Sequence, residues 1–447
     1  VFIILLVIIA IIVFIKWREY YYKKLLHTDT LTQIPNKQYF MKTAEKILDN
    51  NSDKSYLLTS LDARNFKLIN ERFGHIVGDQ TLMNIAKNIK SKFHKNGLYA
   101  RSQGDSFLIL VEDTSQNREL LKSLVDLDIS IHNTTNYKVP LKIGVCPIPR
   151  YNPALSLSLY IDRANIAKKY TSARNTNYIC YFTDDMNKKL NMKNMIEREM
   201  VRALSKGEFV VYYQPKYELA NDTIIGAEAL VRWNHKEKGI ISPGVFIPVF
   251  ERNGFIVDLD FYVYEQVLKM QKHRLDMGKK VIPISMNVSR CHLSDTNFVD
   301  KLEAVVAKYK VPKQYIEMEI TESIFSQEDS SAIALIYNLK EHGFTISMDD
   351  FGSGYSSLNL LRKVQIDTLK IDKVFIDSTE DVQRSQVIVE EIINMASKIH
   401  VKTICEGVET QSQRDFLKNA GCNMVQGYFY SKPLPYEDFS DLLNSSK

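Results

Sequence analysis

The chain has 447 residues, a net charge of +5 at neutral pH, and 45% hydrophobic and 25% charged residues. This length predicts roughly two to four domains, and the composition is that of a globular protein, which excludes a disordered chain. The mild charge, without a long block of Lys and Arg, argues against a surface for a nucleic-acid polymer. Cysteines are widely separated and form no CxxC pair, so we expect reduced thiols in a cytosolic compartment.

The amino-terminal segment is an unbroken apolar run over residues 1–15, followed directly by Lys16, Trp17 and Arg18. The run is shorter than the roughly 20 residues that span a bilayer, but the chain begins with valine, so we expect a piece of a longer protein. Trp and basic residues after such a run are typical of a membrane interface facing the cytoplasm. The alternative is a buried core helix.

From this pattern we predict the carboxy-terminal part of a transmembrane helix over 1–17 and a juxtamembrane segment over 18–30. The localisation that follows is the cell (inner) membrane, with the domains after the helix in the cytoplasm.

Residues 31–183 show an alternation of helical and strand-like periodicity. The predicted helices are 36–48, 78–93 and 156–170, and the predicted strands are 56–61, 107–111 and 138–145. Strands that alternate with helices in a unit of this size predict a small α/β sandwich. Residues 184–205 then predict a connecting helix, without a Pro- and Gly-rich linker.

Residues 206–447 contain a repeating strand signal, with helix-length amphipathic segments between most repeats. The predicted strands are 209–214, 224–233, 281–288, 315–320, 344–348, 368–371, 401–405 and 424–428. This number of strands over about 250 residues is typical of a (β/α)8 TIM-like barrel. The predicted fold is therefore α/β: a small sandwich followed by a barrel, behind the remnant of a transmembrane helix.

Most of the barrel strands end in, or are followed by, a polar residue. These residues are Glu228, Asn287, Glu319, Asp349, Asp350, Lys370, Glu406 and Gln426. The strand ends of a barrel meet on one face, where barrel enzymes keep their active sites. Because buried acids without matching bases are costly, we expect cations to neutralise them. An all-oxygen ligand set favours Mg²⁺ or Mn²⁺ over zinc.

Asp349 and Asp350 end an alternating run, and the turn Gly352-Ser353-Gly354 follows. Two adjacent aspartates favour a site for two metal ions, in which a water attacks a phosphorus in line. An aspartate-rich turn without metal is the alternative. Lys370 is a lone cation among acids. Its role is either a neutralising salt bridge or the placing of the attacking water, with Glu406 accepting the proton.

The barrel region resembles the EAL phosphodiesterase family, which hydrolyses cyclic di-GMP to the linear dinucleotide pGpG. The motifs that carry the resemblance occur in family order along the whole region. They are Tyr213-Gln214-Pro215-Lys216, Glu228-Ala229-Leu230-Val231-Arg232, Asn287-Val288-Ser289, Glu319-Ile320-Thr321-Glu322, Asp349-Asp350-Phe351-Gly352, Leu369-Lys370-Ile371-Asp372, Glu406-Gly407-Val408-Glu409 and Gln426-Gly427-Tyr428.

The resemblance implies a role for each of these polar residues. It implies two Mg²⁺ or Mn²⁺ ions, one held by Glu228, Asn287, Glu319 and Asp349, and the other by Asp349 with Asp350. It implies substrate contacts for Gln214, Arg232 and Gln426, and a nucleophilic water held by Lys370 and Glu406. Glu322 would anchor the mobile loop 351–358, which links the site to a homodimer interface, and Glu409 would support the site.

The first region resembles the GGDEF domain family, whose active members condense two GTP molecules into cyclic di-GMP. The sequences LTQIPNKQYF, LDARNFKLINERFGHIVGDQTL and YARSQGDSFLIL carry this resemblance, together with Lys168. The name-giving motif has Gln103 in place of its first glycine and Ser106 in place of its glutamate. Cyclase activity is therefore not expected, because a glutamine side chain and a lost carboxylate hinder the binding of metal and triphosphate.

Other residues remain at the metal- and guanine-binding positions of that family, namely Asp62, Asn70, Asp79 and Asp105. They leave GTP binding without turnover open, beside a purely structural domain. The family's product-inhibition motif would fall on residues 94–97 and is absent.

The leading hypothesis is a membrane-anchored phosphodiesterase for cyclic di-GMP, regulated by a degenerate GGDEF domain. A receptor that binds cyclic di-GMP without hydrolysis is the first alternative. Glu228, Asp350, Lys370 and Glu406 argue against it, because a receptor does not need the machinery for metal and water. A chain with both activities is the second alternative, and Gln103 and Ser106 argue against that one.

Overall fold

The computed structural model describes residues 26–131, 135–171, 178–325, 330–352, 361–376 and 382–445, and positions 11, 12, 14, 16 and 18. At 126–131, 135–138, 323 and 325 it describes the backbone only. The chain divides into two compact units, residues 1–192 and 193–447. Most of the predicted transmembrane segment 1–17, and residues 19–25 of the juxtamembrane segment 18–30, lie outside the described residues. Of the helices that are described, none combines the length and the apolarity that a bilayer crossing requires.

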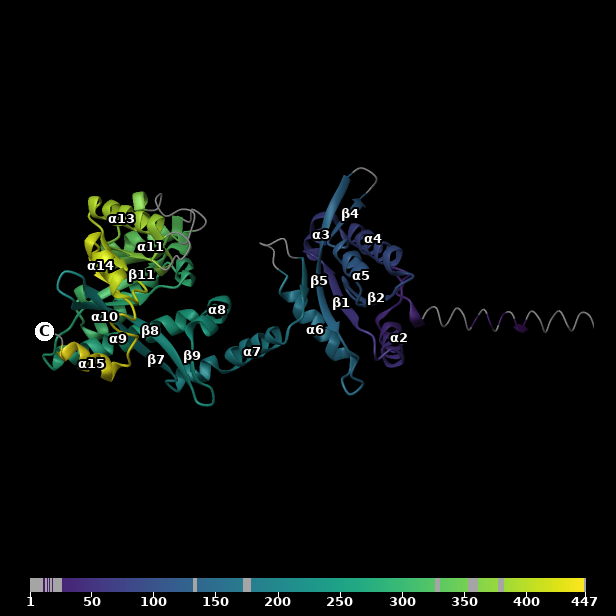
Figure 1. The fold of residues 1–447 in the computed structure, drawn as a ribbon, viewed down its shortest axis with the longest axis horizontal. Helices are drawn as coiled ribbons and strands as arrows, with labels where there is room; N and C mark the ends of the chain where they lie inside the picture. The colour runs from purple at the N-terminus through teal and green to yellow at the C-terminus, as the bar shows by residue number, and fades with distance from the viewer. Residues whose placement is uncertain are drawn as a thin grey trace, which may run out of the picture. The chain divides into compact units, whose positions relative to one another are not determined.

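The first unit is built on a sheet with strand order β2-β3-β1-β5-β4, in which every neighbouring pair runs antiparallel. Its strands are β1 (Tyr56–Ala63), β2 (Gly97–Gln103), β3 (Ser106–Glu112), β4 (Asp126–Ile131) and β5 (Thr135–Ile148), with β6 (Ile179–Tyr181) parallel to β5. The helices are α2 (Lys37–Asn50), α3 (Phe66–Phe73), α4 (His75–Phe93), α5 (Ser115–Lys122) and α6 (Leu157–Lys169) (Figure 1).

Two apolar cores form on the two faces of this sheet. Leu57 and Leu61 of β1 pack in one core with Ile85 of α4, whereas Leu58 packs in the other with Phe40 of α2. This alternation follows from the two-residue period of a strand. The predicted α/β sandwich is therefore correct, although the sequence prediction missed β2, β4, β6, α3 and α5.

The second unit is a closed barrel. Its ring follows the order β10-β11-β12-β13-β14-β15-β7-β8, and the pairing of β8 with β10 closes it. The strands are β7 (Phe209–Glu218), β8 (Thr223–His235), β10 (Ile284–Asn287), β11 (Ile316–Thr321), β12 (Thr345–Phe351), β13 (Thr368–Ile371), β14 (Lys402–Cys405) and β15 (Met424–Val425), and β9 (Gly239–Ile241) pairs with β8 outside the ring. The prediction of an eight-stranded barrel is confirmed.

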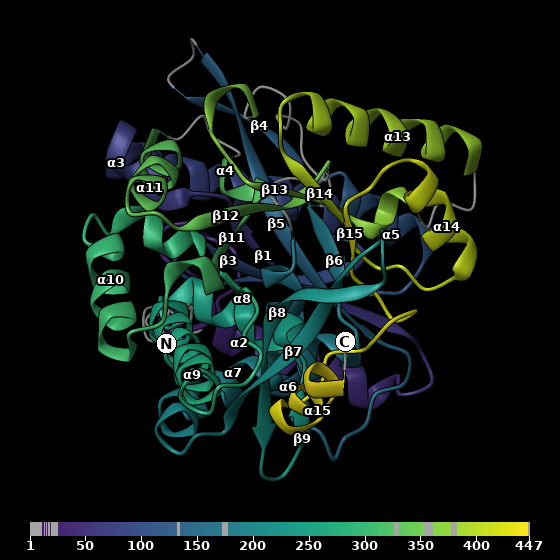
Figure 2. The same cartoon turned by 90° about the vertical axis from the view of Figure 1, so that its left-hand side faces the viewer.

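The helices lie around the outside of the ring (Figure 2). They are α8 (Pro243–Asn253), α9 (Ile256–Asp276), α10 (Phe298–Tyr309), α11 (Ser330–Glu341), α13 (Val382–Lys398), α14 (Gln411–Asn419) and α15 (Tyr436–Ser445). Helix α7 (Asp184–Ser205) precedes the barrel. The expected (β/α)8 pattern was wrong at one place: β7 runs antiparallel to both of its neighbours. A short turn joins β7 to β8 where a helix would be needed for a parallel pair.

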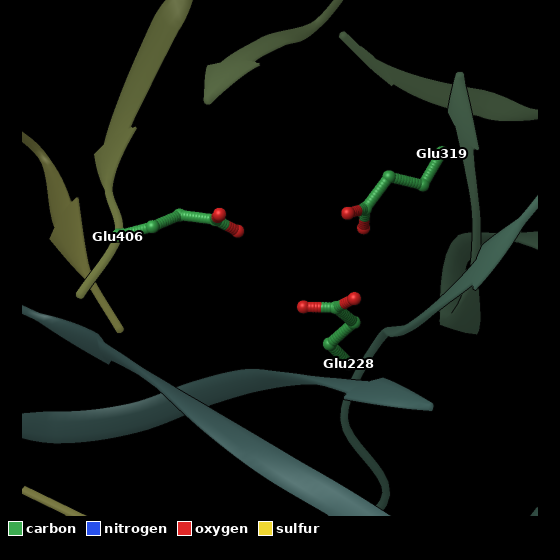
Figure 3. Close-up of side chains that lie close together, drawn as sticks. All are labelled: Glu228, Glu319 and Glu406. Atoms are coloured by element: carbon green, nitrogen blue, oxygen red, sulfur yellow. The ribbon is translucent and has the colours of Figure 1, made fainter. Parts of the chain in front are cut away.

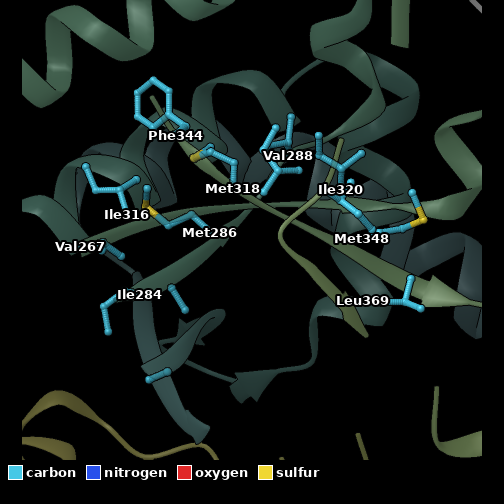
Figure 4. Packing of buried hydrophobic residues seen from close by; sticks show 14 of the residues in the cluster. Val267, Ile284, Met286, Val288, Ile316, Met318, Ile320, Phe344, Met348 and Leu369 are labelled. Carbon is cyan, nitrogen blue, oxygen red and sulfur yellow. The ribbon is translucent and has the colours of Figure 1, made fainter. Parts of the chain in front are cut away.

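The parallel strands divide their side chains between two environments. Met286 of β10, Met318 of β11 and Met348 of β12 lie in the apolar core with Val267 of α9 (Figure 4). The neighbours of these methionines in sequence, Ser285, Glu317, Glu319 and Ser347, are also buried, and so is Lys370 beside the core residue Leu369. Since neighbouring side chains on a strand point to opposite faces, the polar set faces the inside of the barrel. The barrel interior is therefore polar.

Candidate active site

Lys370 of β13 is the centre of a cluster of buried charges, with only 1% of its surface exposed. Its Nζ lies 2.6 Å from Glu406 Oε1, 3.1 Å from Asp349 Oδ1 and 3.6 Å from Glu228 Oε2, and it also contacts Glu319 Oε1. These acids belong to β8, β11 and β12 and to the residue after β14. The structure thus brings together five of the side chains that the sequence places near strand ends.

Three of these carboxylates could hold a metal ion between them. Glu228, Glu319 and Glu406 each offer one oxygen, and these oxygens lie within 4.8 Å of one another. Figure 3 shows the side chains pointing toward a common centre. Glu319 Oε2 is buried and has no hydrogen-bond partner among the described residues. An all-oxygen set that includes an unpartnered carboxylate oxygen fits a hard divalent cation.

Glu228 is surrounded by amide side chains from neighbouring strands. Its Oε2 accepts a hydrogen bond from Gln426 Nε2 at 2.7 Å, and its Oε1 accepts one from Asn287 Nδ2 at 3.4 Å. Gln426 Nε2 also donates to Gln214 Oε1 at 3.1 Å. Burial acts to raise the pKa of Glu228, but Lys370, a second lysine and these amides hold it below its usual value. Glu228 is therefore a carboxylate that the fold keeps ionised.

The two adjacent aspartates follow different backbone paths. The backbone of Asp350 is in the left-handed conformation, with φ of +57°. The pairing register of β12 with β13 shifts between Met348 and Phe351, as at a β-bulge. Burial, reinforced by Glu406 and Glu228, raises the pKa of Asp349 to about 9. Burial, reinforced by Asp372 and Glu406, raises the pKa of Asp350 to about 6. The cluster therefore holds more acid than its own lysines neutralise.

Lys216 of β7 is a second buried lysine, with 2% of its surface exposed. Its Nζ lies 3.3 Å from Glu317 Oε2 and 3.8 Å from Glu319 Oε2. The description of Lys370 as a lone cation was therefore wrong, because Glu319 lies between two lysines. The strand period contains the signal that was missed: Lys216 lies two residues after Gln214, so both side chains point to the same face of β7.

Other predicted residues lie at the edge of the cluster. Glu322, in the 3-10 helix η3 (Glu322–Phe325), accepts a hydrogen bond from the Gly352 N–H. The Arg232 guanidinium lies 5.8 Å from the centre of the Tyr212 ring, and burial lowers its pKa. Glu409 is exposed, and its side chain makes no hydrogen bond to the described part of the chain, so its supporting role stays a prediction. Most of the predicted loop 351–358 lies outside the described residues.

A cavity of about 250 Å³ adjoins the cluster at Asn287. Its walls come mainly from apolar residues of β8, α8 and α9, such as Leu230, Ile247 and Val263. Glu251 and Arg290 are among the charged residues that line it. The cavity offers apolar walls with a few polar groups, the usual chemistry of a small-molecule site.

The first unit has its own polar cluster, centred on Lys168 of α6. Lys168 Nζ lies 2.6 Å from Asp62 Oδ1, 2.9 Å from Ser60 Oγ and 3.5 Å from Ser106 Oγ. Asp62 and Ser106 are directly paired across β1 and β3. The amine of Lys168 therefore contacts the side chains at both positions where the GGDEF resemblance places metal ligands.

The other predicted nucleotide-site residues of this unit are spread around the cluster. The name-giving motif of the GGDEF family contains the tight turn between β2 and β3, where Gly104 has φ of +59°. Burial, reinforced by Asp62, raises the pKa of Asp105. A side chain at position 78 would collide with Asn70 Oδ1, so Asn70 packs against Gly78. Asp79 is exposed on α4.

Two curated relatives resemble nearly all of this chain. MucR of Pseudomonas aeruginosa, a bifunctional diguanylate cyclase/cyclic di-GMP phosphodiesterase, is 28% identical over 92% of this chain and 60% of its own length. PdeR of Escherichia coli, a cyclic di-GMP phosphodiesterase, is 30% identical over 92% of this chain and 62% of its own length. The chain thus spans about three-fifths of the length of these two relatives.

A solved structure of the PaMucR phosphodiesterase in complex with c-di-GMP matches with a TM-score of 0.52 and 32% identity, over 55% of this chain and 99% of that one. Residues 26–176 match the family model described as diguanylate cyclase, GGDEF domain. Residues 197–433, more than half of the chain, match the model of the EAL domain. The chain therefore belongs to the EAL domain family and carries a GGDEF domain in tandem before its EAL domain.

Proposed function

We propose that the EAL domain of this chain hydrolyses cyclic di-GMP to linear pGpG. The observation that carries the proposal is the convergence of Glu228, Glu319 and Glu406 around Lys370 at the strand ends of the barrel. The names of MucR and PdeR, both cyclic di-GMP phosphodiesterases, support the choice of substrate. The PaMucR structure with c-di-GMP supports the same choice.

We further propose that the site uses two Mg²⁺ or Mn²⁺ ions. Glu228, Asn287, Glu319 and Asp349 would hold one ion, and Asp349 with Asp350 the other. The raised pKa of Asp349, and the Glu319 oxygen that has no hydrogen-bond partner among the described residues, support a site whose acids exceed its two lysines. When bound, such ions withdraw charge from the phosphate and make a water more acidic.

We assign Glu406 as the acceptor of the proton that the attacking water loses. Its carboxylate is partly exposed and reaches the centre from the side opposite Glu228 and Glu319 (Figure 3). Lys370 Nζ lies 2.6 Å from Glu406 Oε1 and holds it toward the reacting phosphate. The water oxygen bonds to phosphorus and the bond from that phosphorus to the ribose 3′ oxygen breaks. Glu406 accepts the proton that the water loses, and the leaving 3′ oxygen takes a proton from solvent to become a hydroxyl. Gln214, Arg232 and Gln426 would contact the substrate.

The cavity beside Asn287 is proposed to take a guanine base. Its apolar walls suit the faces of a purine. Carboxylate and guanidinium groups, as on Glu251 and Arg290, match the donors and acceptors on the edge of guanine. The cavity adjoins a residue of the charged cluster, so a base placed there brings its phosphate toward Lys370.

The GGDEF domain is proposed to regulate the EAL domain without making cyclic di-GMP. Gln103, Ser106 and the contact of Lys168 with Asp62 support this assignment. GTP is the proposed ligand of this domain. Anchoring in the cell (inner) membrane by residues 1–17, catalysis in the cytoplasm and a homodimer formed through the EAL domain complete the proposal.

The test is the hydrolysis of cyclic di-GMP by the 447-residue chain in Mg²⁺ or Mn²⁺, with and without GTP. We expect pGpG from the wild type and none from Glu228→Ala. Glu237→Ala, an exposed acid beyond the end of β8, is the matched control and should keep the wild-type rate. Tight binding without product would make the chain a receptor, and full activity of Glu228→Ala would overturn the metal assignment.

A further inference from the structure

Asn287 is the most exposed of the proposed metal ligands. It is the last residue of the short strand β10, and its side chain is exposed. Toward β11 it pairs with Glu319, but toward β8 the pairing stops at Ser285. The strand ladder therefore holds Asn287 on one side only.

Two side chains of helix α9 form hydrogen bonds with the backbone at and after Asn287. The Tyr264 hydroxyl donates a hydrogen bond to the backbone carbonyl of Asn287 at 2.9 Å, and Tyr264 is fully buried. One turn earlier on the same face of α9, Asp260 Oδ2 accepts a hydrogen bond from the Ser289 N–H at 3.3 Å. The same oxygen lies 2.9 Å from His292 Nε2. Hydrogen bonds from one helix thus restrain the backbone at Asn287 and at Ser289.

The side chain of Asn287 is oriented at the same time. Its Nδ2 donates to Glu228 Oε1 at 3.4 Å. An amide that turns its nitrogen toward one carboxylate turns its oxygen away from it. A fixed backbone is needed for this orientation to persist, because the side chain of Asn287 is exposed.

We propose that Tyr264 is a positioning residue, which fixes Asn287 as a ligand for the metal, and that Asp260 secures the segment that follows. This inference rests on the proposed function, since it assumes that Asn287 ligates a cation. Groups that hold metal ligands in place commonly change metal affinity when they are removed. A hydrogen bond to a backbone carbonyl can instead be purely structural, and the experiment must separate these two roles.

The chain offers a matched control on the same helix. Tyr262 also donates its hydroxyl to a backbone carbonyl, that of Phe209, at 3.0 Å. Phe209 is at the start of β7 and is none of the proposed ligands. Removing either hydroxyl deletes one side chain to backbone hydrogen bond on α9, but only Tyr264→Phe releases Asn287.

The measurement is Mn²⁺ affinity by titration calorimetry on the full chain, together with the midpoint of thermal unfolding. Tyr264→Phe should raise the Kd for Mn²⁺ on the order of tenfold, whereas Tyr262→Phe should leave it within about twofold of the wild type. Both variants should lower the unfolding midpoint by similar amounts. Unchanged Mn²⁺ affinity in Tyr264→Phe, or an equal loss in both variants, overturns the proposal.

A double-mutant cycle tests whether Tyr264 acts through Asn287. In an Asn287→Ala background the carbonyl partner remains but the ligand is gone, so adding Tyr264→Phe should not weaken Mn²⁺ binding further. A further loss overturns the proposal. If the wild type binds Mn²⁺ but leaves cyclic di-GMP intact, the proposed hydrolysis fails, while the role of Tyr264 is still decided by these affinities. If the wild type binds no Mn²⁺, the inference fails.

Discussion

The backbone N–H of Gly352 donates a hydrogen bond to Glu322 Oε2 at 2.9 Å, which ties the end of β12 to the residue that follows β11. Gly352 has φ of +96°, and a side chain there would collide with the Phe375 ring. The backbone directly after Asp349 and Asp350 is therefore restricted from two sides. Glu322 thus restrains the backbone where the strand that carries the two aspartates ends. It is not among the acids that form ion pairs with Lys370.

Glu322→Ala should lower kcat for cyclic di-GMP on the order of tenfold or more, because a hydrogen bond to a charged group contributes about 1.5 to 3 kcal/mol. Mn²⁺ affinity should stay within about threefold of the wild type, because Phe351, between the aspartates and Gly352, stays paired with Ile371 of β13 and holds the ligand segment without Glu322. Glu322→Gln keeps an acceptor oxygen for Gly352 and is the control that should retain most of the rate. Loss of Mn²⁺ binding in Glu322→Ala would instead make Glu322 a ligand.

The buried ion pair of Lys216 with Glu317 is expected to stabilise the barrel. Lys216→Met leaves Glu317 buried without the cation that lies 3.3 Å away. Breaking such a pair from one side typically costs about 3 to 5 kcal/mol, so the free energy of unfolding should fall by an amount of this order. Denaturant titration of the full chain measures it.

Two further variants make the Lys216 test specific. Lys216→Met combined with Glu317→Gln removes both charges and should recover part of the lost stability. Lys301→Met breaks the exposed pair with Asp295 and should cost less than about 1 kcal/mol. If the double variant were as unstable as Lys216→Met alone, the ion pair would not be the cause.

The third prediction concerns the stability of the metal-free protein as a function of pH. Asp349 has a pKa of about 9 in the folded chain, against about 4 for an unfolded aspartate. Between these values the folded state binds the proton that the unfolded state has released. The free energy of unfolding therefore falls as pH rises through this window. Asp350, with a pKa of about 6, adds the same trend below pH 6.

In a chelator, the unfolding midpoint should consequently be lower at pH 9 than at pH 6. Excess Mn²⁺ should reduce this difference, because the cation favours the ionised aspartates. Asp349→Asn cannot ionise and should flatten the profile in the chelator. A profile that is as steep in Asp349→Asn as in the wild type would assign the pH dependence to other groups.

The sequence predicted the barrel well because its parallel strands alternate clearly. Apolar residues such as Met318 recur beside acids such as Glu319, and this period identifies both the strand and its buried polar face. The antiparallel direction of β7 was not predicted, because periodicity carries no information on strand direction. In the first unit, α3 directly precedes α4, and the helical signal was read only from residue 78 onward. Strand β2 lacks strong alternation and was missed for that reason.

The candidate site was predictable where a polar residue interrupts an otherwise apolar strand, as Glu228 does within β8 and Glu319 and Asp349 do near the ends of β11 and β12. Contacts that cross the barrel were not predictable in this way. Lys216 lies 101 residues before Glu317 in the chain, and only the closure of the ring brings them together. The hydrogen bond from Tyr264 to the carbonyl of Asn287 also depends on how α9 packs against β10, which no local pattern of the sequence encodes.

The last prediction concerns the GGDEF domain and the contact between Lys168 and Asp62. Lys168 Nζ lies 2.6 Å from Asp62 Oδ1 and 3.5 Å from Ser106 Oγ, so the lysine already supplies a positive charge to Asp62, the one carboxylate of the directly paired residues Asp62 and Ser106. A glutamate at position 106 would add a second carboxylate, which one lysine cannot neutralise. The combined variant Gln103→Gly and Ser106→Glu should therefore bind Mn²⁺ together with GTP more tightly than the wild type.

Calorimetric titration of GTP into the full chain, with Mn²⁺ and with a chelator, measures this effect. The combined variant should gain on the order of tenfold in affinity from Mn²⁺, whereas the wild type should gain little. Gln103→Gly with Ser106→Gln has a side chain of the same size without the charge, and it should behave as the wild type does. Cyclic di-GMP formed from GTP by the wild type would show that Ser106 does not abolish synthesis, and the regulatory assignment of this domain would have to include a second activity.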